Sequence, residues 1–466
     1  NILSVSNDGE GQAITFHSEV NGSHQLNVNA ASSVVNIERS FGAQNALTGL
    51  TVYANLLNTK ADITLERGAG EFYTNIQLAN NVQIEDQGRE GLFFFGKIDG
   101  DYDLNLISNQ IVVVKKDVGS TVPLNAVNIS SNRIDVWASI AANSGAISFD
   151  GDVELCENVK LINCGSTGIC FNGKVDGDFF MELRVKDKNG KISFNEDIGQ
   201  HQPLRHMVLT TSSPVTFNKK VNVDNFETTA PNSIFYNDVL VAGDFNVRNV
   251  LFDGARQNVN LMGGGQILGN ATFNNKGDLT LGADDQVEFN VGGIISRIDG
   301  PTYARGVVNT SGAIADFSAL HAIGNLKLVS LNSNGTLFNF NSTLDGAHEV
   351  TIDAQNGSVN FYDYVGNHHP LAALEVNAPS IAMQRQIAVK DGDIALNGDL
   401  NLMNHSSIRN VGGEKVCITG HVNGEWDLSI YANASDAQIL ISGTIGAQSP
   451  INHLNVETSN KVDLTK

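Results

Sequence analysis

The chain has 466 residues, of which 41% are hydrophobic and only 17% charged, a balance that supports a buried core and excludes ordinary disorder. Its 29 basic and 50 acidic side chains give a formal net charge of −21, so we expect no binding to nucleic acid. Val, Ile, Thr, Phe and Asn dominate over helix formers, which excludes a helical bundle or coiled coil. No stretch approaches the ~20 apolar residues of a membrane span, so we expect this segment not to cross a bilayer. Asn1 opens directly into a strand-like segment, with no signal-peptide pattern.

A first motif recurs five times along the chain. Each copy has a hydrophobic residue, then Asp or Asn, then Gly, with an aromatic residue or His two positions later. The glycines are Gly22, Gly100, Gly177, Gly346 and Gly424, and the residues two positions later are His24, Tyr102, Phe179, His348 and Trp426. Successive glycines are 78, 77, 169 and 78 residues apart, so the third interval covers two repeats with some excess. The sequence therefore contains a repeat of about 78 residues.

A second motif follows the first by 19 to 22 residues in every copy. It consists of a hydrophobic residue and a Gly, a polar loop usually ending in Pro, and a strand-like segment, with glycines at Gly42, Gly119, Gly199, Gly366 and Gly446. Together the motifs divide the chain into units of about 1–78, 79–155, 156–235, a degenerate 236–325, 326–403 and 404–466. The phase is lost between about 205 and 335, where Val241–Val247, Phe252–Val259 and the segment around Gly300 all resemble decayed copies. We leave the choice among them open.

Alternation within the units predicts which side chains face the interior, because strand side chains alternate with period two. Matching positions in the five copies should point inward: Ile14 and Phe16, Leu92 and Phe94, Ile169 and Phe171, Phe338 and Phe340, and Val416 and Ile418. The residues between them should point outward: Thr15, Phe93, Cys170, Asn339 and Cys417. We therefore expect Phe16, Phe94, Phe171 and Phe340 to stack inside the fold and Phe93 to be an exposed aromatic residue.

Short strands separated by Gly, Asn and Asp turns fit a sandwich, a propeller or a solenoid. A sandwich of this length would need several domains, yet no Pro- or Ser-rich linker separates the units. The two halves of a unit do not resemble each other, as propeller blades would. A solenoid tolerates turns of variable length, so we predict one continuous right-handed parallel β-helix over 1–466, with three or four coils per unit. Roughly 20 coils spaced ~4.8 Å apart would make an elongated rod on the order of 100 Å long.

The alternation of the two motifs resembles the tandem repeats of large bacterial surface exoproteins, of the filamentous-haemagglutinin and autotransporter-passenger type. The resemblance rests on Gly22, Gly100, Gly177, Gly346 and Gly424 with their partner motifs, and covers perhaps two-thirds of the chain. Pro-Leu occurs in only three of the five partner motifs. The resemblance implies export to the cell surface, a β-helical shaft and a role in adhesion or surface coating. No secretion domain or translocator barrel is recognised at either end, so we expect the chain to be a segment of a longer protein.

Metal and thiol chemistry find little support in the residue spacings. Asp99–Asp103 has the composition of a calcium loop, but its twelfth position is Gln110 rather than Glu. His201 matches His368 in the repeat, and His206 matches His453, but equivalents several coils apart are too distant to share one metal. Cys156, Cys164, Cys170 and Cys417 lack zinc-site spacing, and we leave open whether Cys164 and Cys170 form a disulfide. We predict no catalytic, cofactor-binding or metal-binding residues.

The predicted function is that of a non-catalytic structural or adhesive shaft at a bacterial cell surface or in the extracellular space. Its expected partners are host or neighbouring-cell surface molecules, glycans, or other copies of itself. One alternative is a polysaccharide lyase or hydrolase, whose acidic cluster would have to lie at Asp284, Asp285 and Glu288 in the degenerate section. Another is a glycan-binding phage or viral fibre with Tyr102 and Trp426 in an aromatic platform. The simpler interpretation of these two rings is that they staple a turn or lie in the core.

Overall fold

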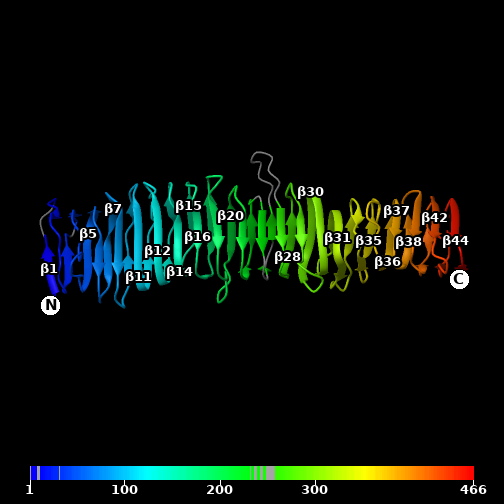
Figure 1. Cartoon of the computed structure of the whole chain (residues 1–466), viewed down its shortest axis with the longest axis horizontal. Coiled ribbons are helices and arrows are strands. Elements are labelled where there is room, and N and C mark those ends of the chain that lie inside the picture. The colour runs from blue at the N-terminus through cyan, green and yellow to red at the C-terminus, as the bar shows by residue number, and fades with distance from the viewer. Residues whose placement is uncertain are drawn as a thin grey trace. The chain divides into compact units, whose positions relative to one another are not determined.

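A computed structural model describes residues 2–7, 11–30, 32–230, 232–235, 239–241, 245–247 and 258–465. It confirms an all-β parallel β-solenoid of about 20 turns (Figure 1). Every helix or strand assigned in the described residues is a β-strand, and they contain no helix long and apolar enough to cross a membrane. The chain divides into two compact units, Asn1–Ser233 and Ile234–Lys466. The handedness of the solenoid and its continuity as one rod stay predictions.

The strands of the first unit are mostly three to twelve residues long. They are β1 (Ile2–Ser6), β2 (Ile14–Phe16), β3 (Gln25–Asn29), β4 (Val34–Ile37), β5 (Gly49–Thr59), β6 (Ile63–Leu65), β7 (Gly70–Leu78), β8 (Val82–Asp86), β9 (Leu92–Phe94), β10 (Ile98–Asp99), β11 (Asp103–Val114), β12 (Ala126–Val136), β13 (Ile140–Ala142), β14 (Ile147–Leu155), β15 (Val159–Asn163), β16 (Gly168–Phe171), β17 (Val175–Asp176), β18 (Phe180–Val185), β19 (Lys191–Phe194), β20 (His206–Thr210), β21 (Val215–Phe217), β22 (Val221–Val223) and β23 (Phe226–Thr228).

The second unit contains the remaining strands, and β24 begins two residues before it. They are β24 (Asn232–Phe235), β25 (Val239–Val241), β26 (Phe245–Val247), β27 (Asn258–Leu261), β28 (Gly265–Phe273), β29 (Leu279–Leu281), β30 (Glu288–Thr310), β31 (Ile314–Ser330), β32 (Leu337–Phe340), β33 (Leu344–Asp345), β34 (Glu349–Asp353), β35 (Ser358–Phe361), β36 (Ala373–Met383), β37 (Gln386–Val389), β38 (Ile394–Leu402), β39 (Ser406–Asn410), β40 (Lys415–Ile418), β41 (Val422–Asn423), β42 (Asp427–Ala432), β43 (Gln438–Ile441), β44 (His453–Thr458) and β45 (Lys461–Leu464). Of the three candidate decayed copies, Phe252–Val259 lies largely outside the described residues, and Val241–Val247 lies partly outside them, at 242–244.

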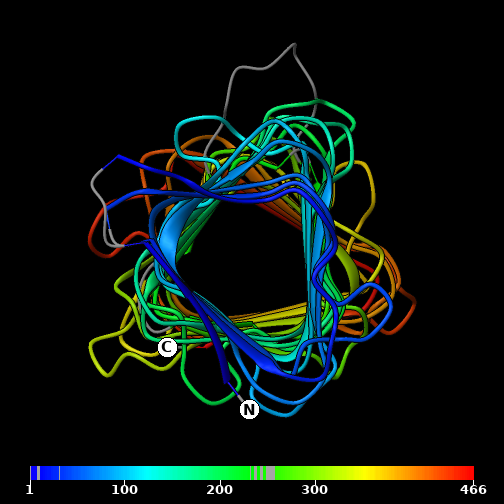
Figure 2. The ribbon, with the colours of Figure 1, turned by 90° about the vertical axis from the view of Figure 1, so that its left-hand side faces the viewer.

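Each coil of the first unit contributes three strand positions around a common interior, as the end-on view in Figure 2 shows for its blue and cyan coils. From β3 the chain passes through β4 and a bridge at Phe41, and then enters β5. The first half of β5 pairs with β3 and its second half pairs with β4, both in parallel register. Side chains fill the interior, so the space inside the ribbons is the hydrophobic core.

The 78-residue repeat does not correspond to a whole number of coils. The column containing β2 continues through β4 and the second halves of β5 and β7 to β10. The column containing β9 instead runs through the first halves of β7 and β5 to β3. The step from β2 to β9 therefore spans three coils and two further strand positions, within the predicted three to four coils. Equivalent residues of successive repeats consequently lie on different sides of the solenoid.

The second unit follows the same rule. β32 pairs with β35, which pairs with the second half of β36. β40, which holds the equivalent residues one repeat later, pairs with the first half of β38, and that half pairs with the first half of β36. The two copies thus occupy different columns here as well.

The predicted inward orientation is confirmed for four of the five copies. The side chains of Leu92, Phe94, Ile169 and Phe171 are at most 1% exposed, and the corresponding pairs in the second unit are equally buried. Ile14 and Phe16 are only half-buried, because β4 is the one described strand that pairs with β2. The expected stacks form between neighbouring coils rather than between repeats.

The predicted outward orientation is also confirmed. Thr15, Cys170, Asn339 and Cys417 are all partly exposed. Phe93 points outward too, but it is half-buried rather than exposed. Its neighbours on the same face cover part of the ring, because side chains of adjacent coils are about 4.8 Å apart.

Candidate functional surface

The two sequence motifs contact each other across adjacent coils. The backbone N–H of Gly119 donates to the carbonyl of Ile98 at 2.7 Å, and that of Gly100 donates to the carbonyl of Val122 at 3.3 Å. The Asp99 side chain accepts hydrogen bonds from the backbone N–H groups of Thr121 and Val122 at 2.8 and 3.2 Å. The acidic residue of the first motif therefore caps the polar loop of the second.

The same cap is present in all five copies. The acceptors are Asn21, Asp99, Asp176, Asp345 and Asn423, and the backbone donors are Gln44, Thr121, His201, His368 and Gln448, at 2.9, 2.8, 2.9, 3.1 and 3.1 Å. The constant spacing of 19 to 22 residues between the motifs is thus the length of one coil. Either Asn or Asp can form this cap, because both side chains carry an oxygen that accepts hydrogen bonds.

Glycine is required at both motifs by the backbone. Gly100 has a φ of +136° and Gly119 a φ of +72°, values that side chains disfavour. A Cβ at Gly119 would lie 2.4 Å from the carbonyl oxygen of Ala141 on the next coil. These glycines therefore allow the close approach of successive coils.

Amide side chains form ladders along the outside of both units. Asn36 and Asn58 are hydrogen-bonded at 2.9 Å in the first unit, and Asn339 and Asn360 at 2.9 Å in the second. Such ladders satisfy donors and acceptors between identical side chains on adjacent coils. They stabilise the outer surface.

An aromatic stripe runs along one outer side of the first unit, at consecutive coils. We define it as Tyr53, Tyr73, Phe95, Lys115 and Trp137. The first two rings stack with 4.6 Å between centroids, and the second and third with 4.3 Å, at 6° and 3° between planes. The Lys115 ammonium lies 3.0 Å from the centre of the Trp137 ring, a cation–π contact. Because the rings stack along the coils, the faces between them are covered, and edges and hydroxyls are what a ligand would meet.

A column of carboxylates lies on the same side of the first unit. Asp135 is in register with Glu154, and Glu154 with Asp176. Burial raises the pKa of Glu154, Arg133 opposes that rise, and the charges of Asp176 and Asp135 add to it. Arg133 binds Asp135 at 2.6 Å and His201 lies 3.1 Å from Asp176, so the two ends are paired with cationic or ionisable groups. Burial and two neighbouring like charges therefore favour the protonated form of Glu154.

Sequence reasoning missed both the stripe and the column. Their members are spaced by 19 to 22 residues, from Tyr53 to Tyr73 and from Asp135 to Glu154 for example, which is the coil length. A search at that period would have found them, whereas the 78-residue period separates equivalent residues onto different sides.

The acidic residues that the sequence singled out are held by separate partners. Arg305 binds Asp285 at 3.0 Å, Asn309 binds Glu288 at 2.7 Å, and Asp284 accepts a hydrogen bond from the backbone of Gln286 at 2.8 Å. The hydrogen bond from Arg305 lowers the pKa of Asp285. These contacts link neighbouring segments, and the structure does not place the three carboxylates around one common partner.

The repeat-equivalent histidines each have partners within their own unit. His201 lies against Asp176 in the first unit, and His368 lies 3.5 Å from Asp345 in the second. His206 packs edge-on against Phe180, with 5.4 Å between ring centroids. His453 pairs through its backbone with Asp427. Within the described ranges, no three His, Cys, Asp or Glu side chains are arranged to hold a metal ion.

A histidine-rich cluster does occur in the second unit. His321 lies in register between Tyr303 on one coil and Asp345 on the next. The ring of His369 packs edge-on against His321, with 5.5 Å between centroids. Burial lowers the pKa of His321, and the nearby His369 and His348 lower it further.

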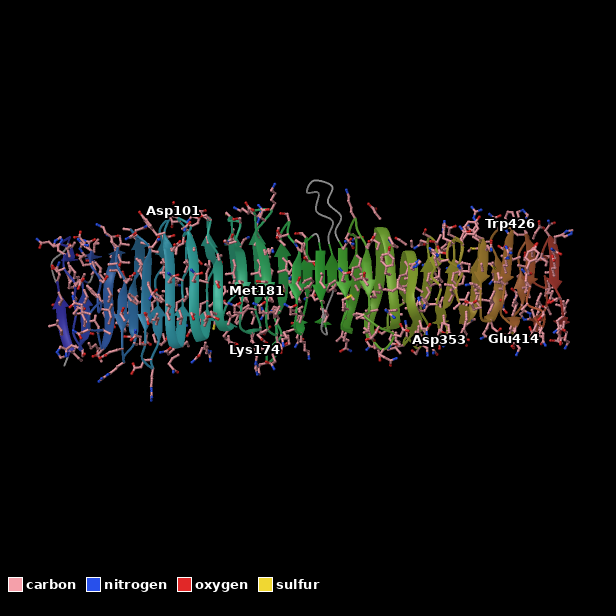
Figure 3. The ribbon with its side chains drawn as sticks, viewed as in Figure 1. Asp101, Lys174, Met181, Asp353, Glu414 and Trp426 are labelled. Carbon is pink, nitrogen blue, oxygen red and sulfur yellow. The ribbon has the colours of Figure 1, made fainter. Side chains whose placement is uncertain are left out.

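The remaining candidates are surface features. In the Asp99–Asp103 segment, Asp99 caps a loop and Asp103 binds Asn125, while Asp101 projects outward (Figure 3). Tyr102 and Trp426 are each 38% exposed, so they do not lie in the core, and the other half of that interpretation, that they staple a turn, stays a prediction. Trp426 packs edge-on against His405, with 5.2 Å between ring centroids.

All four cysteines are free thiols in the structure, so Cys164 and Cys170 are not bridged. Burial raises the pKa of the Cys156 thiol to about 11, and the charges of Asp135 and Glu154 contribute to the rise. A thiol with this pKa is protonated at neutral pH and a poor nucleophile.

No protein-family model, curated protein or solved structure matches the chain. The class that the observations define is the parallel β-solenoid, built from coils of three strand positions.

Proposed function

We propose that the chain is a non-catalytic structural or adhesive shaft of a large bacterial surface or secreted protein, akin to filamentous-haemagglutinin-type and autotransporter-passenger repeats. It would work outside the cell, with its partners being host or neighbouring-cell surface molecules, glycans or further copies of itself.

The observation that supports the proposal best is the cap between the two motifs. The polar residues that define the repeat, such as Asp99 and Asn423, bind backbone N–H groups of the next coil. Their recurrence is therefore explained by the need to stack coils, which is what selection for a long shaft would preserve. Because successive copies lie on different sides, the repeat distributes similar outer surfaces around the solenoid.

The test is a binding and turnover assay on the purified chain. Acidic and neutral polysaccharides, and fixed host cells, would be presented with and without calcium. Binding without product formation supports a shaft with adhesive surfaces, and the Tyr73→Ala variant would then report whether the aromatic stripe takes part. Turnover of any polysaccharide would contradict the proposal. A stable trimer in sedimentation would favour a phage or viral fibre instead.

The acidic column favours a second candidate, a polysaccharide-acting lyase or hydrolase. Such enzymes use a proton-donating carboxylic acid beside an ionised one, and Glu154 between Asp135 and Asp176 has the charge environment of such an acid. Under this alternative, Glu154→Gln abolishes turnover. Glu182→Gln is the matched control, because Glu182 pairs with Lys160 at 2.9 Å at another strand position.

A further inference from the structure

The second unit contains a concentration of histidines around one buried carboxylate. Asp345 is 5% exposed and accepts hydrogen bonds from the backbone N–H groups of His368 and His369 at 3.1 and 3.4 Å. The loop 366–371 is further held by the N–H of Gly346, which donates to the carbonyl of His369 at 3.0 Å, and by that of Gly366, which donates to Leu344 at 2.7 Å. The cap of this copy is therefore built on the backbone of two consecutive histidines.

The groups around His321 come from every segment packed against it. Tyr303 of β30 contacts the ring edge-on at 5.8 Å between centroids, and Asp345 of β33 is in register on the other side. His369 packs on it from the loop 366–371, and His348 acts on it from the turn after β33.

The more distant ionisable groups, His368 and Asp285, do little to stabilise a proton on His321. His368 is turned to Asp345, at 3.5 Å, and the Asp285 carboxylate is already paired with Arg305. One carboxylate, Asp345, thus faces several imidazoles.

We propose that this cluster is an acid-sensitive latch, in which protonation of His321 loosens the loop 366–371 from the coil that carries Asp345. At neutral pH the rings of His321 and His369 pack together. Below that range His321 takes up a proton, and its positive charge is disfavoured at this partly buried position, where the His369 ring centroid lies 5.5 Å away. Opening separates the rings and hydrates them, so acid favours the open loop. This proposal is independent of the proposed function.

The direction in which pH changes the stability of the closed loop follows from the pKa of His321. Its pKa is lowered in the folded protein from the ordinary value of 6.5, so the closed loop binds fewer protons than the open one. Stability from this group is complete above about pH 6.5 and is lost as the pH falls below it.

The equivalent cap in the first unit is an internal contrast. His201 also faces a buried Asp, Asp176, but the residue in register on the preceding coil is Glu154 rather than a histidine. This copy therefore has a second carboxylate where the other copy has His321, and acid should not loosen its loop. The copy at Asp99 has no histidine in its loop, since Thr121 and Val122 occupy the positions.

The test is hydrogen exchange of the whole chain, followed by mass spectrometry at about pH 8 and about pH 5.5, with rates corrected for the intrinsic pH dependence. We expect protection of the amides of Gly366, His368 and His369 to fall at the lower pH, because the open loop binds more protons than the closed one. The loops containing Thr121 and His201 should keep their protection. Unchanged protection at 366–371, or an equal loss in all three loops, would overturn the latch.

Variants separate the latch from general acid sensitivity. The side chain of His369 is exposed, so the His369→Gln variant should fold. This variant should lose most of the acid response and keep the protection of the loop amides at neutral pH. His321→Gln tests the partly buried partner, and His201→Gln is the matched control with no expected effect on 366–371. An acid response in His369→Gln as large as in the unaltered chain would refute the mechanism.

Discussion

The rings of Phe171 and Phe194 lie face to face on adjacent coils, with 5.0 Å between their centroids and 3° between their planes. Both side chains are at most 1% exposed. The ladder continues to Phe149 on one side and Phe217 on the other, with centroids 4.9 and 5.3 Å apart. Because this separation matches the spacing of coils, each ring fills the interior of its own coil and contacts the next.

Replacing Phe171 by Ala should lower the free energy of unfolding by about 3–5 kcal/mol, because it leaves a cavity within a stacked ladder. Phe93→Ala is the control, since Phe93 is outward-facing and half-buried, and it should cost clearly less. Chemical denaturation followed by circular dichroism would measure both. Equal losses for the two variants would contradict the assigned orientation.

Gly119→Ala should destabilise the first unit more than Gly22→Ala. Both positions have positive φ, +72° and +132°, but only at Gly119 would a Cβ meet another coil's backbone. The strained backbone alone costs on the order of 1–3 kcal/mol, and the clash with Ala141 adds to it. The melting temperatures of the two variants would measure this difference. A lower melting temperature for Gly22→Ala than for Gly119→Ala would contradict the close contact between Gly119 and the backbone of Ala141.

Asp99→Asn should be nearly neutral, because Asn21 and Asn423 perform the same cap in other copies. Asp99→Ala should cost about 1–2 kcal/mol, since the N–H groups of Thr121 and Val122 lose their acceptor. Hydrogen exchange at these two amides is the direct measurement. Equal protection in the Ala and Asn variants would show that the cap contributes nothing.

Cys156 should react slowly with iodoacetamide at about pH 8, because only the thiolate is nucleophilic. A pKa of about 11, against an ordinary value of 9.0, implies roughly a hundredfold less thiolate than for an unperturbed cysteine. Mass spectrometry of the alkylated peptide would compare the native chain with the chain in denaturant. A native rate equal to the denatured rate would refute the raised pKa.

The sequence allowed the solenoid and its core to be predicted, because the period-two alternation around Leu92 and Phe94 depends only on local geometry. It was less informative about the ends and the outer surface. Ile14 and Phe16 carry the same pattern as Phe94, yet their burial depends on how many strands pair with β2.

The outer surface depends on coil length, which the motifs concealed. Tyr53 and Tyr73, or Asp135 and Glu154, become neighbours only when turns of unequal length are aligned. The lowered pKa of His321 likewise arises from burial in the stacked coils, and then from His369 and His348, which come from later segments of the chain. The sequence pointed instead to Asp285, whose charge is neutralised by Arg305.

The mismatch between repeat and coil has an evolutionary consequence. Duplication of one repeat in the gene would insert three coils and two strand positions. Every residue downstream of the insertion within a unit would then be displayed one third of a turn away from its former direction. Only a triple duplication would restore the original direction, so copy number alone could alter which side of the surface a given epitope occupies.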